Sequence, residues 1–265
     1  MTLFHAFLLG IIQGLTEFIP VSSTAHLLIG QKLLGLPADD AMFSFLVIVQ
    51  LGTLVSLFVY YWKDLLSILR ATLDFRHPTS DRNLGLYILL ATIPALLAGY
   101  LLKDAVEALF RQPMLEASIR LLTAAVLLSL AEWLTRKNRK LDSMNWLDAL
   151  IIGVMQVISV FPGASRSGTT IAGGMFRGFD RPSAARFAFL MSVPVMLAAG
   201  AYEMLDVIRM PDLGGFLPLL AVGFVTAAIV GWFAVRWLIG YLGKHSLYVF
   251  AIYCAVLSLI TFLLR

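Results

Sequence analysis

A run of polar residues interrupts the first apolar stretch of this chain. Residues 13–26 carry a carboxamide, a carboxylate, several hydroxyl groups and an imidazole, between the mostly apolar residues 3–12 and 27–34. Ionisable groups at membrane depth are uncommon and usually face a cavity or a partner, so the cluster predicts a functional site. The competing interpretation is a polar loop at the membrane surface, between two short amphipathic helices.

The composition defines the class of protein. Hydrophobic residues make up 60% of the 265 positions and charged residues 14%, and the mean hydropathy is +0.87. Soluble domains are far more polar, so we expect an all-α integral membrane protein that contacts the lipid bilayer. The single cysteine, Cys254, excludes an intrachain disulfide and a cysteine metal cluster. The net charge of +4 fits basic cytoplasmic loops, and we expect no nucleic-acid partner because the sequence has no basic stripe on a soluble face.

The apolar runs predict the membrane topology. Two stretches, 3–34 and 146–179, are broken by Pro20 and by Pro162 with Gly163, which stop a helix. Each half is too short to cross, so both stretches are predicted to be re-entrant helix hairpins whose loops line a cavity or are covered by protein. Crossing in one helix takes about 20 mostly apolar residues. Six unbroken runs qualify as transmembrane helices, at residues 41–62, 84–102, 114–134, 184–205, 216–238 and 247–264.

The basic residues predict the orientation. Residues 136–140 contain four Lys and Arg in a short loop, which is therefore expected in the cytoplasm. Counting spans from this loop puts residues 35–40 and the C-terminus outside. The first hairpin then enters from outside and the second from inside.

The two hairpins also form a sequence repeat. Each is followed by three spans, an odd number, so residues 1–140 and 141–265 of the single membrane domain are predicted to be inverted-topology repeats. In such proteins the broken helices meet near the bilayer midplane and build the binding site. An offset of 143 positions pairs Ala6 with Ala149, Gly10 with Gly153, Gln13 with Gln156, Phe18 with Phe161, Ser22 with Ser165 and Gly30 with Gly173.

The first hairpin carries groups suited to nucleophilic chemistry. With a helix break at Pro20, Ser22 would cap the next helix, and the following amides, including that of Thr24, would form an anion site. Gln13 and Glu17 would share one face of the first half-helix. Ser23, His26 and Glu17 could supply a nucleophile, a base and an orienting group.

The second hairpin carries groups suited to binding an oxyanion. The Arg166 guanidinium matches a phosphate bidentately, and neighbouring hydroxyl and glycine residues would let the backbone and side chains approach it. Alternatively, the small residues only allow close helix packing, and Arg166 is a structural partner of Glu17. Together, the hairpins favour phosphoryl chemistry or phosphate binding. The hydroxyl and glycine residues of the second hairpin that would contact the phosphate are Gly163, Ser165, Ser167, Gly168 and Thr169.

Residues 13–26 and 162–170 resemble the two motifs of the bacterial undecaprenyl-diphosphate phosphatases, the bacitracin-resistance family. The resemblance covers the whole chain in length, span count and motif positions. It implies hydrolysis of the terminal phosphate of undecaprenyl diphosphate, which yields the monophosphate carrier of peptidoglycan synthesis. It also implies a location in the bacterial cytoplasmic (inner) membrane, with the active site open to the periplasm.

The resemblance also implies residue roles. Glu17 and His26 match acid/base positions, Ser23 matches the nucleophile, and Arg166 with Ser165 and Ser167 matches the diphosphate-binding loop. A divalent cation, Mg²⁺ or Ca²⁺, is implied as well, with Glu17 as a ligand. The chain has Gln13 where many members have Glu, and Ala25 where Gly is usual. One carboxylate and one imidazole are few ligands for a hard cation, so substrate oxygens would have to complete the set.

Two alternatives stay open from the sequence. In the reaction, His26 and Glu17 could activate water directly while Ser23 only binds substrate. A different class of function is an alternating-access transporter or flippase of a phosphorylated lipid or organic anion, because inverted repeats with broken helices are typical of transporters. The oligomeric state is not determined, and a homodimer is one option.

Overall fold

The computed structural model describes residues 1–37, 39–74, 76–102, 113–160, 164–208 and 213–264. Helices make up the regular structure of these residues, apart from an isolated bridge between Arg139 and Phe179. The all-α prediction is therefore confirmed for this part of the chain. The helices are α1 (Leu3–Thr16), α2 (Ser23–Leu33), α3 (Asp40–Leu73), α4 (Ser80–Leu101), α6 (Pro113–Leu134), η1 (Leu141–Ser143), α7 (Trp146–Val157), η2 (Ile158–Val160), α8 (Arg166–Phe176), α9 (Arg181–Ile208), α10 (Leu213–Leu242) and α11 (Tyr248–Leu263).

Helices α3, α4, α6, α9 and α10 are long and apolar enough to cross a membrane, which makes five in the described part of the chain. The sixth predicted span, 247–264, corresponds to α11, which has 16 residues. At 1.5 Å per residue it is about 24 Å long, shorter than the hydrocarbon core of about 30 Å. The count of six spans is therefore not confirmed by helix length.

Helix α3 continues well beyond its predicted end at residue 62. Its backbone kinks at Tyr61 (φ −105°, ψ 18°) and then runs on to Leu73. The extension carries Lys63, Asp64 and Arg70. A search for apolar runs stops at such charges, although straight-chain basic residues favour a helix, so the prediction was too short.

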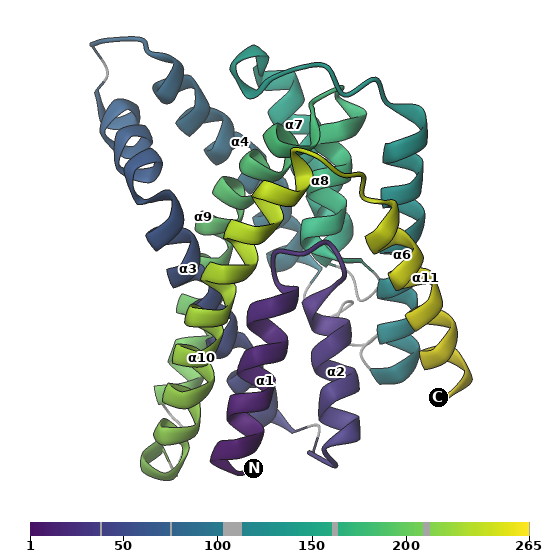
Figure 1. Cartoon of the computed structure of the whole chain (residues 1–265). Helices are drawn as coiled ribbons and strands as arrows, with labels where there is room; N and C mark the ends of the chain where they lie inside the picture. The colour runs from purple at the N-terminus through teal and green to yellow at the C-terminus, as the bar shows by residue number, and fades with distance from the viewer. Residues whose placement is uncertain (38, 75, 103–112, 161–163, 209–212, 265) are drawn as a thin grey trace.

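The first predicted hairpin is broken where the sequence indicated, and the predicted break of the second lies outside the described residues. Helix α1 ends at Thr16 and α2 begins at Ser23, with Pro20 between them. Helix α7 and the short η2 are separated from α8 by a segment that includes Pro162 and Gly163, which lie outside the described residues. In Figure 1 α1 and α2 occupy the lower half of the molecule, α7 and α8 the upper half, and the α1–α2 turn lies at mid-height.

The first half-helix of each hairpin, α1 or α7, packs closely against a long helix. A Cβ atom on Gly10 of α1 would lie 2.7 Å from the Gly223 carbonyl oxygen of α10, and one on Gly153 of α7 would lie 2.5 Å from the Ala91 carbonyl oxygen of α4. Small residues allow helices in a membrane to approach this closely. Gly10 and Gly153 are therefore contact points that fix α1 on α10 and α7 on α4.

Charged groups join the α6–α7 connection to the second hairpin. Asp148 is fully buried and accepts hydrogen bonds from Arg139 Nη2 at 2.7 Å and Arg177 Nε at 2.7 Å. Lys140 pairs with Asp180, in the turn between α8 and α9. Partial burial raises the pKa of Asp180, but hydrogen bonds from Lys140 and Ser183 outweigh it and hold the pKa below its ordinary value.

Candidate active site

Glu17 is the centre of a polar cluster at the break between α1 and α2. Its Oε2 accepts hydrogen bonds from Gln13 Nε2 and Ser23 Oγ, both at 2.7 Å. Gln50 Nε2, from α3, lies 3.3 Å from Oε1. The residue is only 6% exposed. The carboxylate is thus buried but surrounded by donors, which offsets the cost of removing it from water.

The second hairpin reaches the same cluster. An Arg166 guanidinium nitrogen pairs with Glu17 Oε1. Ser167 Oγ donates to the Ile19 carbonyl oxygen at 3.3 Å. Ser165 is the N-cap of α8, and its Oγ accepts from the Gly168 amide at 3.2 Å. The start of α8, whose dipole favours anions, therefore lies against the first hairpin.

Ser22 has an unusual backbone conformation, with φ 67° and ψ 91°. A non-glycine residue at positive φ costs about 1 kcal/mol or more, and such strain is concentrated at functional sites. Ser22 caps α2, as predicted, because its Oγ accepts from the Ala25 amide at 3.4 Å. Its carbonyl oxygen accepts from His26 Nδ1 at 2.8 Å.

His26 contacts Tyr253 of α11. Since the Ser22 carbonyl can only accept, Nδ1 carries a proton, and the Nε2 lone pair of a neutral ring accepts from the Tyr253 hydroxyl at 2.7 Å. The His26 and Tyr253 rings also stack, with centroids 5.7 Å apart. The basic nitrogen of His26 is therefore engaged by Tyr253, whereas Ser23 is held by Glu17. The expected contact between Ser23 and His26 is not the arrangement in this structure.

A cavity of about 170 Å³ lies between the hairpins. Of the predicted site residues, seven line it: Glu17, Ser22, Ser23, Thr24, Ser165, Arg166 and Ser167. The remaining described ones support its wall or lie beside it. Gln13 bonds Glu17, the Gly168 amide bonds Ser165, Thr169 Oγ1 donates to the Arg166 carbonyl oxygen at 2.9 Å, and His26 has the contacts given above. Gly163 lies outside the described residues.

Other elements bring to this cavity polar residues that were not among the predicted site residues. Gln50 comes from α3, Arg120 from α6, Gln156 from the end of α7 and Ser159 from η2. A signal for Arg120 was present, because it lies with Glu116 inside an apolar span and ionisable residues there are uncommon. Gln50 also interrupts an apolar run, but which helices would bring either residue to the hairpins depends on packing.

The residues present do not fit a resident hard cation. In the described part of the chain no three His, Cys, Asp or Glu side chains come together. Glu17 is the carboxylate of the cavity wall, and Arg166 already neutralises it. Mg²⁺ and Ca²⁺ prefer several oxygen ligands, so the described residues alone do not form a site for either ion.

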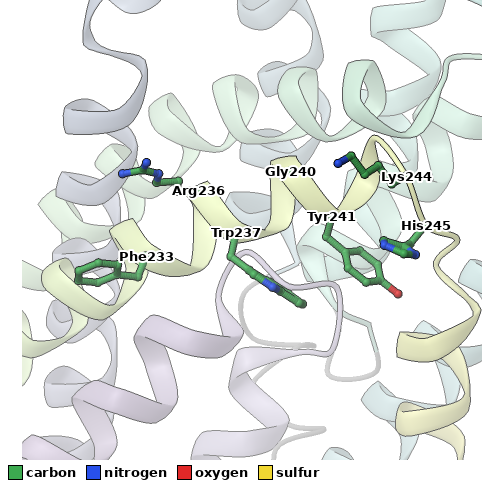
Figure 2. A pocket seen from close by; sticks show the side chains of 7 residues that line it. All are labelled: Phe233, Arg236, Trp237, Gly240, Tyr241, Lys244 and His245. Atoms are coloured by element: carbon green, nitrogen blue, oxygen red, sulfur yellow. The ribbon is translucent and has the colours of Figure 1, made fainter.

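A larger, open groove of about 550 Å³ runs along the end of α10 and shares no lining residue with this cavity. In Figure 2 Arg236 and Lys244 point to one side of the helix, and Trp237 and Tyr241 to the other. Aromatic and basic side chains of this kind are typical of a membrane–water interface. No carboxylate is present among its lining residues, which are Phe233, Arg236, Trp237, Gly240, Tyr241, Lys244 and His245.

Comparison with known proteins assigns the family. The sequence profile of the bacitracin resistance protein BacA matches residues 6–260. The chain belongs to this family. A BacA relative from Chloroherpeton thalassium, named undecaprenyl-diphosphatase, is 42% identical over 97% of this chain and 95% of its own length. Relatives with the same name from Chlorobium phaeovibrioides and Mycobacterium marinum are 39% and 38% identical, over 100% and 97% of this chain and 97% and 92% of theirs.

Proposed function

We propose that this chain hydrolyses undecaprenyl diphosphate to undecaprenyl phosphate and inorganic phosphate. The observation that carries the proposal is the Ser23 hydroxyl, which is hydrogen-bonded to the buried Glu17 carboxylate in a cavity that Arg166 also lines. The name of the BacA relatives supplies the substrate. The product would serve as lipid carrier for peptidoglycan synthesis, and recycling it would confer resistance to bacitracin.

In the proposed reaction Glu17 is the general base. Glu17 takes the Ser23 proton while Ser23 Oγ attacks the terminal phosphorus, and the bond from phosphorus to the bridging oxygen breaks. Undecaprenyl phosphate leaves, and a water molecule then releases phosphate from the serine. Arg166 and the start of α8 stabilise the charge on the transferred phosphoryl group. Arg166 must exchange its contact with Glu17 for one with substrate, which frees the Glu17 carboxylate to accept the Ser23 proton.

In the proposed reaction His26 positions the start of α2, and a divalent cation binds together with the substrate. Through Tyr253 and the Ser22 carbonyl, His26 holds the strained start of α2 that carries Ser23. A Mg²⁺ or Ca²⁺ ion would arrive with the diphosphate, bound mainly by phosphate oxygens, so that Glu17 stays available as the base.

We propose a location in the bacterial cytoplasmic membrane, with two inverted repeats, α11 as the sixth crossing and the cavity open to the periplasm. Equivalent caps support the repeat. Thr2 and Asn145 both start half-helices with a capping box, and Ser22 and Ser165 both cap the second half-helices. Both pairs are 143 positions apart, the offset of the sequence repeat. The basic residues 136–140 support the orientation.

The decisive experiment is a phosphate-release assay with purified protein in detergent and undecaprenyl diphosphate. We expect stoichiometric phosphate and undecaprenyl phosphate, loss of activity with a chelator and its return with Mg²⁺ or Ca²⁺. Rapid quenching should trap phosphate on Ser23, whereas a water mechanism would leave the serine unmodified. Intact substrate that binds without phosphate release would contradict the proposal and favour a transporter.

Light scattering of the same preparation tests whether the protein is a homodimer.

A further inference from the structure

Gln156 lines the cavity in an unusual state. The residue is 1% exposed, and neither its Oε1 nor its Nε2 has a hydrogen-bond partner among the described residues. Most buried polar side-chain atoms are paired, because leaving them unpaired costs stability. An amide kept in this state at a cavity wall indicates a partner that arrives with a ligand.

Arg120 reaches the same cavity from α6. Its Nε donates to Glu116 Oε1 at 2.8 Å, and its Nη1 donates to the Ala164 carbonyl oxygen at 3.0 Å. The Arg120 and Glu116 side chains are only 7% and 5% exposed. A buried ion pair contributes little stability compared with apolar residues of similar size, so stability does not explain why this pair lies within an apolar helix.

The contact with Ala164 fixes where Arg120 lies. Ala164 directly precedes Ser165, the N-cap of α8, so the Arg120 guanidinium lies beside the start of α8, where Arg166 is the first residue. The lining of the cavity thus includes two guanidinium groups and one carboxylate. A diphosphate carries two phosphate groups, and each of them can accept hydrogen bonds from one guanidinium.

We propose that Arg120 and Gln156 form a second phosphate subsite, which binds the phosphate attached to the polyprenyl chain. Arg166 and the start of α8 then hold the terminal phosphate that is removed. The inference rests on the proposed diphosphatase function. Since the lipid-linked phosphate stays on the product, this subsite contacts substrate and product alike. Loss of the subsite therefore weakens the binding of both, so KM and the inhibition constant of the product should rise together.

The test uses two variants in the purified protein. Glu116→Gln combined with Arg120→Gln removes the guanidinium without leaving an uncompensated buried carboxylate. Gln156→Leu removes the amide at similar size. For the double variant we expect KM for a polyprenyl diphosphate and the inhibition constant of the polyprenyl monophosphate to rise together by about 10- to 100-fold, the worth of a charged hydrogen bond. The value of kcat should fall by less than KM rises, because the subsite contacts the lipid-linked phosphate before and after the reaction.

Gln156→Leu should raise both constants as well, by about tenfold. It should also increase the Tm of the substrate-free protein, since an unpaired buried amide is removed. A merely structural Gln156 would lower Tm when replaced and leave both constants unchanged. If the double variant does not fold, Gln156→Leu alone tests whether the second phosphate subsite exists.

Ser118→Ala is the matched control on α6. Ser118 is buried, and its Oγ donates to the Ser258 carbonyl oxygen of α11 at 3.0 Å, so the change disturbs the packing of α6 outside the cavity lining. Its KM should stay at the wild-type value. Unchanged KM and monophosphate inhibition in a folded double variant would overturn the inference, as would a fall in kcat alone. Wild-type protein that releases no phosphate would instead reject the proposed function, so the two failures are distinguishable.

Discussion

At the scale of single residues, the contacts of Ser23 and His26 distinguish the general base from the residue that positions α2. Ser23 donates to Glu17 at 2.7 Å, while His26 Nε2 is engaged by the Tyr253 hydroxyl. General bases must lie within hydrogen-bond reach of the proton they take. The geometry therefore favours Glu17 as the base and His26 as the residue that positions the start of α2.

Glu17→Gln should lower kcat by about 10²- to 10⁴-fold, because the amide cannot accept the Ser23 proton. His26→Gln should lower kcat less, since an amide can still donate to the Ser22 carbonyl oxygen. Steady-state phosphate release measures both. A loss in His26→Gln equal to that in Glu17→Gln would make His26 the base and contradict the assignment.

Arg166→Lys isolates the shape of the guanidinium from its charge. The ammonium can still pair with Glu17, so the variant should fold with a Tm near that of the wild type. A point charge cannot replace the bidentate fork on the transferred phosphoryl group, so kcat should fall by about 10²-fold or more. Arg186→Lys is the control, because Arg186 pairs with Asp64 in an exposed contact at 3.2 Å and should keep full activity. Near-normal turnover in Arg166→Lys would remove Arg166 from the reaction.

The site residues that lie close together along the chain could be predicted from the sequence. Ser22, Ser23 and Glu17 meet because a helix break at Pro20 brings neighbours together, and that break can be predicted from local chemistry. Arg120 and Gln50 join the cavity through packing of α6 and α3 on the hairpins, which no local pattern specifies. The orientation of His26 depended on Tyr253, more than 200 residues away along the chain.

At the scale of elements, close packing of α3 on α10 positions Gln50, which lines the cavity. A Cβ atom on Gly52 of α3 would lie 2.3 Å from the Phe224 carbonyl oxygen of α10, and backbone cannot move aside as a side chain can. Gln50, two residues earlier, donates to Glu17. The distance between these helices therefore affects both stability and the position of Glu17.

Gly52→Ala should destabilise the protein by about 1–3 kcal/mol, the cost of overpacking, and should lower activity through Gln50. Thermal unfolding in detergent measures the first effect and phosphate release the second. Gly99→Ala in α4 is the control, since no atom lies within 4 Å of its added Cβ and alanine favours the helix. Equal Tm values for the two variants would show that the α3–α10 contact tolerates a methyl group.

At the scale of the whole molecule, two hairpins from different parts of the chain build the site. The α1–α2 hairpin brings the carboxylate and the serine, and the α7–α8 hairpin brings Arg166 and the start of α8. In Figure 1 the hairpins come from opposite halves of the molecule, while both chain ends lie toward the lower end. Offset and motif order could be predicted from the sequence, but helix lengths differed because α3 continues past its apolar part and α11 has only 16 residues.

The proposed orientation of the protein in the membrane can be tested without an activity assay. Pro37 precedes α3 and Asn138 lies in the basic α6–α7 connection, and both are exposed. Cysteine placed at Pro37 should react with a membrane-impermeant maleimide in intact spheroplasts, because the loop faces outward when residues 136–140 are cytoplasmic. Asn138→Cys should react only after the membrane is opened. Wild-type protein serves as the blank, since its Cys254 is buried. The reverse pattern would place the cavity mouth on the cytoplasmic side, where a phosphatase of this kind would act on a different pool of lipid.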